Sequence, residues 1–209
     1  MEEDGRVRRR TGRPLSFNRD AALTQAMLLF WRHGYEATSL SDLTAAMGIT
    51  PPSIYAAFGD KKRLFLEAVD RYCSGPVTPE RIIEGAPTAR DAAFELMRQS
   101  AIGFTGETTP PGCLLATGAI SCSAAAEDVR KHLAGIRHDI EGRLAARIAR
   151  AVEAGELADA ADAEALAAHV MAVIQGMSTL ARDGVPRDKL MRVAETAMRA
   201  WPSPEEPEA

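Results

Sequence analysis

The chain of 209 residues is long enough for one large domain or two small ones with a substantial buried core. Its 46% hydrophobic and 26% charged residues are typical of a globular protein and argue against a largely disordered chain. A net charge of −4 provides no overall attraction to nucleic acid. The first 72 residues nevertheless carry 11 basic and 9 acidic side chains, whereas the remainder carries 14 and 20, so the N-terminal third suits a polyanionic partner better.

The cysteine content and the absence of an apolar leader bear on the compartment. The chain has three cysteines, Cys73, Cys113 and Cys122. They match neither a metal-ligand pattern nor the even set of a disulfide framework. Residues 1–13 lack the apolar run of a signal peptide, and the apolar stretch 165–181 is interrupted by His169 and Gln175, which suits a helix covered by protein. We expect a cytoplasmic protein with no membrane partner, metal or cofactor.

Capping residues and helical periodicity predict four helices in the first third of the chain. A flexible basic arm at residues 1–16 precedes Asn18, which can cap a helix that runs to about His33. Gly34 then ends that helix, because glycine readily adopts a positive φ. Three further helices are expected at residues 40–47, 51–58 and 61–72.

The segment 74–88 is rich in proline and glycine and predicts the connection between two domains, 17–73 and 89–201. Strand-like alternation is absent, so the predicted fold is all-α. The second domain is expected to contain helices at 89–104, 113–123, 128–154, 162–183 and 186–201. A disordered tail is expected at 202–209, which is rich in proline and glutamate.

Residues 38–58 carry the features of a helix-turn-helix. Ser39 followed by Asp42 predicts a capping box at the start of the first helix, and Gly48 permits the turn after it. Thr50 is a good N-cap for the second helix, since Pro51 suits a first helical position. The alternative interpretation is a pair of short core helices with ordinary caps.

The second helix of this pair predicts a DNA contact surface, because it buries Ile54 and Phe58 and leaves its N-terminal side to small, hydroxyl-bearing or flat groups. The expected base and groove contacts come from Thr50, Pro51, Pro52, Ser53 and Tyr55. The expected contacts to phosphates and along the groove come from Thr38, Ser39, Lys61 and Arg13.

With these residues laid out, residues 17–72 resemble the DNA-binding domain of the TetR family of repressors. The matching segments are Phe17-Asn-Arg-Asp, Phe30-Trp-Arg-His-Gly-Tyr35, Thr38-Ser-Leu-Ser-Asp and Ile54-Tyr-Ala-Ala-Phe58 followed by Asp60-Lys-Lys. The resemblance implies an all-α homodimer that binds palindromic operator DNA. It also implies a C-terminal domain that dimerises through its last two long helices and holds a small-molecule inducer, whose binding releases the repressor.

The two last predicted helices carry apolar positions that fit this dimerisation role. The predicted interface residues are Leu166, Val170, Val173, Met177, Leu190, Val193, Ala197 and Trp201. The alternative is that the helix at 162–183 is an interior helix of a monomer, covered on all sides by its own chain.

The segment Pro111-Gly-Cys113-Leu-Leu is similar to a motif of one TetR subgroup, some of whose members sense electrophiles through a thiol. Cys113 is therefore a possible sensor thiol, while the alternative is a small buried apolar side chain. A disulfide from Cys113 to Cys122 is not expected, since a helix over 113–123 separates the two by about 13 Å.

Two other classes of protein fit the sequence less well than a ligand-responsive repressor. An enzyme that uses Cys113 or a histidine lacks any accompanying nucleophile, base and orienting group. His132 and His138 are six residues apart and lack a metal-ligand spacing. An architectural DNA binder requires more positive charge than this acidic chain carries.

Overall fold

The computed structural model of the chain describes residues 17–120 and 122–202. The described residues form helices and connecting turns and contain no strand. The α-helices are α1 (Arg19–His33), α2 (Leu40–Met47), α3 (Pro51–Phe58), α4 (Lys61–Cys73), α5 (Pro79–Gly85), α6 (Ala89–Phe104), α7 (Leu114–Thr117), α8 (Glu127–Glu153), α9 (Ala163–Arg182) and α10 (Arg187–Ala197). Two short 3-10 helices cover Ala124–Ala126 and Met198–Ala200. The all-α prediction is confirmed.

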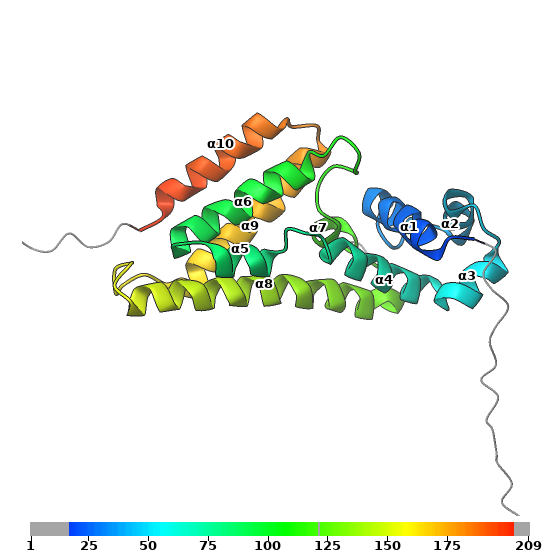
Figure 1. The fold of residues 1–209 in the computed structure, drawn as a ribbon, viewed down its shortest axis with the longest axis horizontal. Helices are drawn as coiled ribbons and strands as arrows, with labels where there is room; N and C mark the ends of the chain where they lie inside the picture. Colours follow the sequence, from blue (N-terminus) through cyan, green and yellow to red (C-terminus); the bar gives the residue numbers. More distant parts are fainter. Residues whose placement is uncertain (1–16, 121, 203–209) are drawn as a thin grey trace, which may run out of the picture.

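The molecule is elongated, with the short helices at one end (Figure 1). Helices α1, α2 and α3 form that end, and α4 leads from them towards the longer helices. Helix α8 runs along one side of the molecule, beneath α4 and α5, while α10 lies on the outer side of α6. Helix α9 contacts α6, α8 and α10 and is therefore the central helix of the C-terminal half.

Local capping explains where the first helices begin. The Asn18 side chain accepts a hydrogen bond from the N–H of Ala21 at 3.0 Å and so starts α1. Ser39 and Asp42 form the predicted capping box at the start of α2, with the Ser39 hydroxyl accepting from the Asp42 N–H and the Asp42 carboxylate accepting from the Ser39 N–H. Gly48 ends α2 in the left-handed conformation at φ 66°.

Two apolar cores hold the chain together. The first core contains side chains of α1, α2, α3, α4 and α7 and of the N-terminal half of α8. Its largest fully buried side chains include Phe30, Phe65 and Leu43. The second joins α5, α6, α9 and α10 with the C-terminal half of α8. Cys113 and Ile174 pack against both cores and so link them.

Two predicted segments differ from the structure. Residues 74–88 contain α5. The helix begins here because the Thr78 side chain accepts a hydrogen bond from the Arg81 N–H and Pro79 occupies the first helical position. Ile83 of this helix is 2% exposed. The helix predicted at 113–123 ends at Thr117. The prediction that Cys113 and Cys122 lie on one helix is therefore wrong. The two form no disulfide, and all three cysteines are free thiols.

Within the described residues, no helix combines the length and the apolar character that a membrane crossing requires.

Candidate DNA-binding surface and ligand cavity

Helix α3 is held by its buried face and by an arginine from α1. Ile54 and Phe58 of α3 are 0% and 5% exposed. The Arg19 guanidinium lies 4.4 Å from the centre of the Phe58 ring and donates to both carboxylate oxygens of Glu67 at 2.5 and 2.7 Å. The same guanidinium donates to the carbonyl oxygen of Ala57 at 3.2 Å. One side chain thus fixes α3 against both α1 and α4.

The opposite side of α3 faces solvent. Thr50, Pro51 and Pro52 are exposed, Ser53 is half-buried, and Tyr55 retains 51% of its accessible surface. Thr50 is the N-cap residue as predicted, but its hydroxyl bonds the Ser53 hydroxyl at 3.0 Å instead of a backbone N–H. The first turn therefore offers two paired hydroxyls, two proline rings and an exposed phenol.

The side chain of Thr38, a predicted phosphate contact, is buried rather than exposed. Thr38 is 1% exposed, and its hydroxyl donates to the carbonyl oxygen of Gly34 at 2.7 Å, so the side chain closes the turn after α1. Ser39, in contrast, is exposed at the start of α2. Its hydroxyl is shared with Asp42 through the capping box, and hydrogen bonds from Ser39 hold the pKa of the Asp42 carboxyl below its ordinary value.

The basic residues at the start of α4 are engaged by the protein. The Lys61 ammonium lies 4.5 Å from the centre of the Tyr35 ring and donates to the carbonyl oxygen of Glu36 at 3.4 Å, and burial lowers its pKa. Lys62 forms a salt bridge with Asp128 of α8. The predicted groove contact from Arg13 lies outside the described residues.

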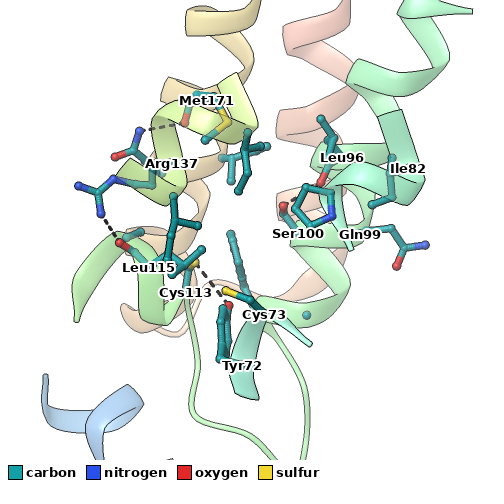
Figure 2. A pocket seen from close by; sticks show the side chains of 18 of the residues that line it. Tyr72, Cys73, Ile82, Leu96, Gln99, Ser100, Cys113, Leu115, Arg137 and Met171 are labelled. Atoms are coloured by element: carbon teal, nitrogen blue, oxygen red, sulfur yellow. Dashed lines mark hydrogen bonds between the residues drawn. The ribbon is translucent and has the colours of Figure 1, made fainter. Parts of the chain in front are cut away.

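A cavity of about 390 Å³ opens between α4, α5, α6, α7, α8 and α9. Its volume falls within the range of small-molecule sites, roughly 300–1,000 Å³. In Figure 2, Ile82, Leu96 and Ser100 line one side, while Leu115 and Met171 line the other. Sequence reasoning did not find this site, because its lining comes from separate helices and forms no motif.

Several polar groups of the cavity wall already have protein partners. The Ser100 hydroxyl donates to the carbonyl oxygen of Leu96 at 2.7 Å, and the Gln175 amide donates to that of Met171 at 3.4 Å. The Arg137 guanidinium donates to the carbonyl oxygen of Leu115. A mostly apolar wall whose donors are already bonded suits a small apolar ligand.

The sulfur of Cys113 lies at one end of this cavity. Its Sγ accepts a hydrogen bond from the Tyr72 hydroxyl at 3.4 Å (Figure 2). Its N–H donates to the Ser178 hydroxyl at 2.8 Å. Burial raises the pKa of the Cys113 thiol. The Tyr72 hydroxyl, the backbone N–H groups at the start of α7 and the charge of Arg137 act in the opposite direction, since each favours a thiolate.

The segment before Cys113 joins the two halves of the molecule. Gly112 adopts a φ of +81°, and a Cβ added there would lie 2.8 Å from the Ser178 carbonyl oxygen, so the chain passes closely against α9. The Arg182 guanidinium of α9 donates to the carbonyl oxygens of Trp31 and Arg32, the last turn of α1, at 3.3 and 3.0 Å. The end of α1 is therefore bound directly to α9.

The predicted dimerisation residues occupy the second core of their own chain. Val170, Met177, Leu190 and Trp201 are buried. Leu166, Val173, Val193 and Ala197 are half-buried and pack against the same core. The buried four pack within the second core of their own chain, which leaves little of their surface for a partner, so their role in dimerisation stays a prediction. The exposed side of α9 carries the small residues Ala165, Ala168, Ala172 and Gly176 together with Glu164, His169, Gln175 and Thr179.

A helix-turn-helix at one end of an all-α fold, followed by a helical second half, defines a class, the DNA-binding transcriptional regulators. Residues 22–68 match the family model described as bacterial regulatory proteins, tetR family. Residues 93–200 match the model described as tetracyclin repressor-like, C-terminal domain. The chain therefore belongs to the TetR family of transcriptional regulators.

Individual relatives extend this similarity over the whole chain. The chain is 37% identical over 203 residues to the HTH-type transcriptional repressor ComR of Escherichia coli strain K12, which covers 94% of each chain. It is 28% identical to the HTH-type transcriptional repressor BdcR of the same strain, over 90% of this chain and 91% of that protein. A cysteine mutant of the TetR family transcriptional regulator CifR has been solved in complex with 26-bp double-strand operator DNA. That chain shares 42% sequence identity with this one, and the two structures superpose with a TM-score of 0.86 over 91% of this chain and 100% of that chain.

Proposed function

We propose that this regulator is a homodimeric repressor that binds palindromic operator DNA through α3 and leaves it when a small molecule fills the cavity. The exposed N-terminal side of α3 is the observation that carries the proposal. Its hydroxyls and flat groups project from a helix whose Phe58 ring packs against the Arg19 guanidinium. A bidentate salt bridge to Glu67 of α4 holds that guanidinium in place. The similar regulator CifR has been solved in complex with operator DNA, which supports DNA as the partner.

In this proposal, Tyr55 and the first turn of α3 contact the major groove, and Ser39 and Lys61 lie beside phosphates. Pro51 and Pro52 lack N–H groups, so they contribute apolar contact, for example with thymine methyl groups. Thr50 and Ser53 contribute hydroxyls that can exchange their mutual bond for bonds to DNA. The surface has few free charges, so shape and half-site spacing contribute much of its specificity.

Dimerisation in this proposal uses the exposed side of α9. Ala165, Ala168, Ala172 and Gly176 recur at helical spacing and lack long side chains, so a second helix can approach closely. Two copies would then place their α3 helices roughly 34–36 Å apart, one turn of DNA. A ligand that favours another separation lowers the operator affinity without touching the DNA contacts.

Two aromatic side chains, Trp31 and Tyr72, connect the cavity to the DNA-binding end. Trp31 and Tyr72 line the cavity, and their rings meet edge to face with centroids 4.9 Å apart. Trp31 belongs to α1 and Tyr72 to α4, the helices that hold α3. A ligand that displaces either ring therefore acts on the support of the recognition helix.

Quantitative DNA binding tests the proposal. Sites selected by the purified protein from genomic fragments should share a palindrome, and the affinity for that palindrome should exceed the affinity for scrambled DNA by about a thousandfold at a stated salt concentration. Failure to recover any common site, or equal affinity for scrambled DNA, would rule the repressor function out.

A second candidate function is sensing of electrophiles by Cys113. It is favoured by the position of its sulfur on the cavity wall, within hydrogen-bond distance of the Tyr72 hydroxyl. Alkylation with N-ethylmaleimide should then release the operator in the wild type but not in Cys113→Ser. Complete alkylation with unchanged operator affinity would exclude this function.

A further inference from the structure

The cavity holds two thiols that come from different halves of the chain. Cys73 is the last residue of α4, and Cys113 directly precedes α7. Both line the cavity, and Figure 2 shows the two sulfur atoms beside the hydroxyl of Tyr72. Cys122 is not part of this wall. The structure thus pairs Cys113 with a cysteine 40 residues earlier in the sequence.

We propose that Cys73 and Cys113 form a peroxide-responsive thiol pair, whose oxidation to a disulfide weakens operator binding. The inference rests on the proposed repressor function. Its chemistry has two steps. A peroxide oxidises the Cys113 thiol to a sulfenic acid and is itself reduced to water or an alcohol. The Cys73 thiol then attacks that sulfur, the S–S bond forms, and the sulfenic oxygen leaves as water with the Cys73 proton.

Local contacts select Cys113 as the sulfur that is oxidised first. Burial raises the pKa of Cys113, but a hydroxyl donor in Tyr72 and the nearby guanidinium of Arg137 oppose that increase, since both stabilise a thiolate. Cys73 lacks these contacts, and burial together with the neighbouring Cys113 raises its pKa to about 11. Cys73 is thus suited to the second step, in which it resolves the sulfenic acid.

The burial of both thiols determines which oxidants reach them. A hydrogen peroxide molecule is small and uncharged, so it can enter an apolar cavity of about 390 Å³ without a counter-ion. Burial raises the pKa of both thiols, so the reduced pair is protonated at neutral pH and reacts less readily than an exposed thiolate.

A disulfide at this position acts on the DNA-binding end through α4. Bond formation draws the C-terminal end of α4 and the segment before α7 together and removes the hydrogen bond from Tyr72 to Cys113. Helix α4 begins only a few residues after α3 ends, so its displacement moves the recognition helix. The Trp31 ring, which rests on Tyr72, carries the same displacement to α1.

The test uses a Cys122→Ser variant, which leaves Cys73 and Cys113 as the only two cysteines of the full-length chain. After treatment with hydrogen peroxide, mass spectrometry of unreduced peptides should show Cys73 linked to Cys113 within one chain. The operator affinity of the oxidised protein should fall by about tenfold or more, and dithiothreitol should restore it. Adding Cys73→Ala, or Cys73→Ser as a second variant, should abolish both the linkage and the reversible loss of affinity.

Two results would overturn the inference. One is oxidation of Cys113 to sulfinic acid, or to disulfides between chains, without a linked Cys73 peptide. The other is a complete Cys73–Cys113 linkage that changes the operator affinity by less than about twofold. The reduced protein separates a failure of this inference from a failure of the proposed function. If the reduced protein shows no preference for a palindromic site, the repressor function fails. The peptide mapping still shows whether Cys73 and Cys113 become linked.

Discussion

Trp31 donates its indole N–H to the carbonyl oxygen of Gly112 at 3.0 Å, across 81 residues of sequence and inside the buried boundary between the two cores. The bond joins α1 of the DNA-binding end to the segment that carries Cys113. It also satisfies the polar atom of a large ring that is only 6% exposed. The junction between the two halves thus depends on where the Gly112 backbone lies.

Replacing Gly112 with alanine should destabilise the protein by about 2–4 kcal/mol, since the residue combines a φ of +81° with a Cβ position 2.8 Å from the Ser178 carbonyl oxygen. Denaturant unfolding measures this change. Gly135→Ala is the matched control, because Gly135 is in the interior of α8 with no atom near its added Cβ, and it should stabilise by about 0.5–1 kcal/mol. Equal effects of the two substitutions would contradict the close packing of the segment against α9.

Replacing Tyr55 with alanine should weaken operator binding by about tenfold or more while changing the free energy of unfolding by less than about 0.5 kcal/mol, because the side chain is half exposed. Fluorescence anisotropy with labelled operator measures the affinity. Ile120→Ala removes an exposed apolar side chain that belongs neither to α3 nor to the cavity wall and should leave the affinity unchanged. Pro52→Ala and Ser53→Ala should instead change which sites are selected, a result that uniform weakening across all sites would contradict.

Replacing Ala172 with arginine should convert the dimer to a monomer and reduce operator affinity, because the exposed side of α9 would then carry a long charged side chain. Analytical ultracentrifugation measures the association state. Arg143→Glu alters the charge on an exposed position of α8 and serves as the control. A variant that still sediments as a dimer would place the interface on another surface.

Replacing Ser39 with alanine should cost about 0.5–2 kcal/mol at neutral pH, since the N-cap of α2 is lost. Ser39 also holds the pKa of Asp42 below its ordinary value of 3.8, so the part of the contribution that depends on the carboxylate is complete above pH 3.8 and is lost as the pH falls through the lower value of the folded state. The difference between the thermal unfolding curves of the wild type and the variant should therefore narrow in acid, while the cap bond to the Asp42 N–H remains. A difference that stays constant down to pH 2 would refute the role of the carboxylate.

The helices that begin and end with strong local features were predictable from sequence. Asn18, Ser39, Gly34 and Gly48 determine boundaries through bonds within a few residues, and the structure has the same bounds within about a residue. Helix α5 is not predicted, because Pro79, which starts it, lies in a segment whose prolines and glycines favour a connection. Ile83 of α5 is buried in the second core, which α6 and the C-terminal half of α8 help to form.

The residues of the candidate sites could be predicted only in part, because the sequence of one chain does not show which helices meet in the fold or which surfaces a partner covers. The apolar face of α9 was visible as a pattern, but periodicity does not say whether its own chain or a partner covers that face, and here Val170 and Met177 contact their own core. Thr38 was assigned to DNA although its hydroxyl closes a turn. The pairing of Cys73 with Cys113 arises only when α4 and α7 meet.

Helix α8 limits how far the two halves of this regulator can be separated. It continues for 27 residues, and its side chains Val129 and Leu133 belong to the first core while Leu144 and Ile148 belong to the second. A fragment that ends after α4 would leave the first core without the side chains that α7 and α8 contribute to it, among them Leu114 and Leu133. The DNA-binding end is therefore not a transplantable module: grafting it onto a foreign sensor requires the first half of α8 to move with it.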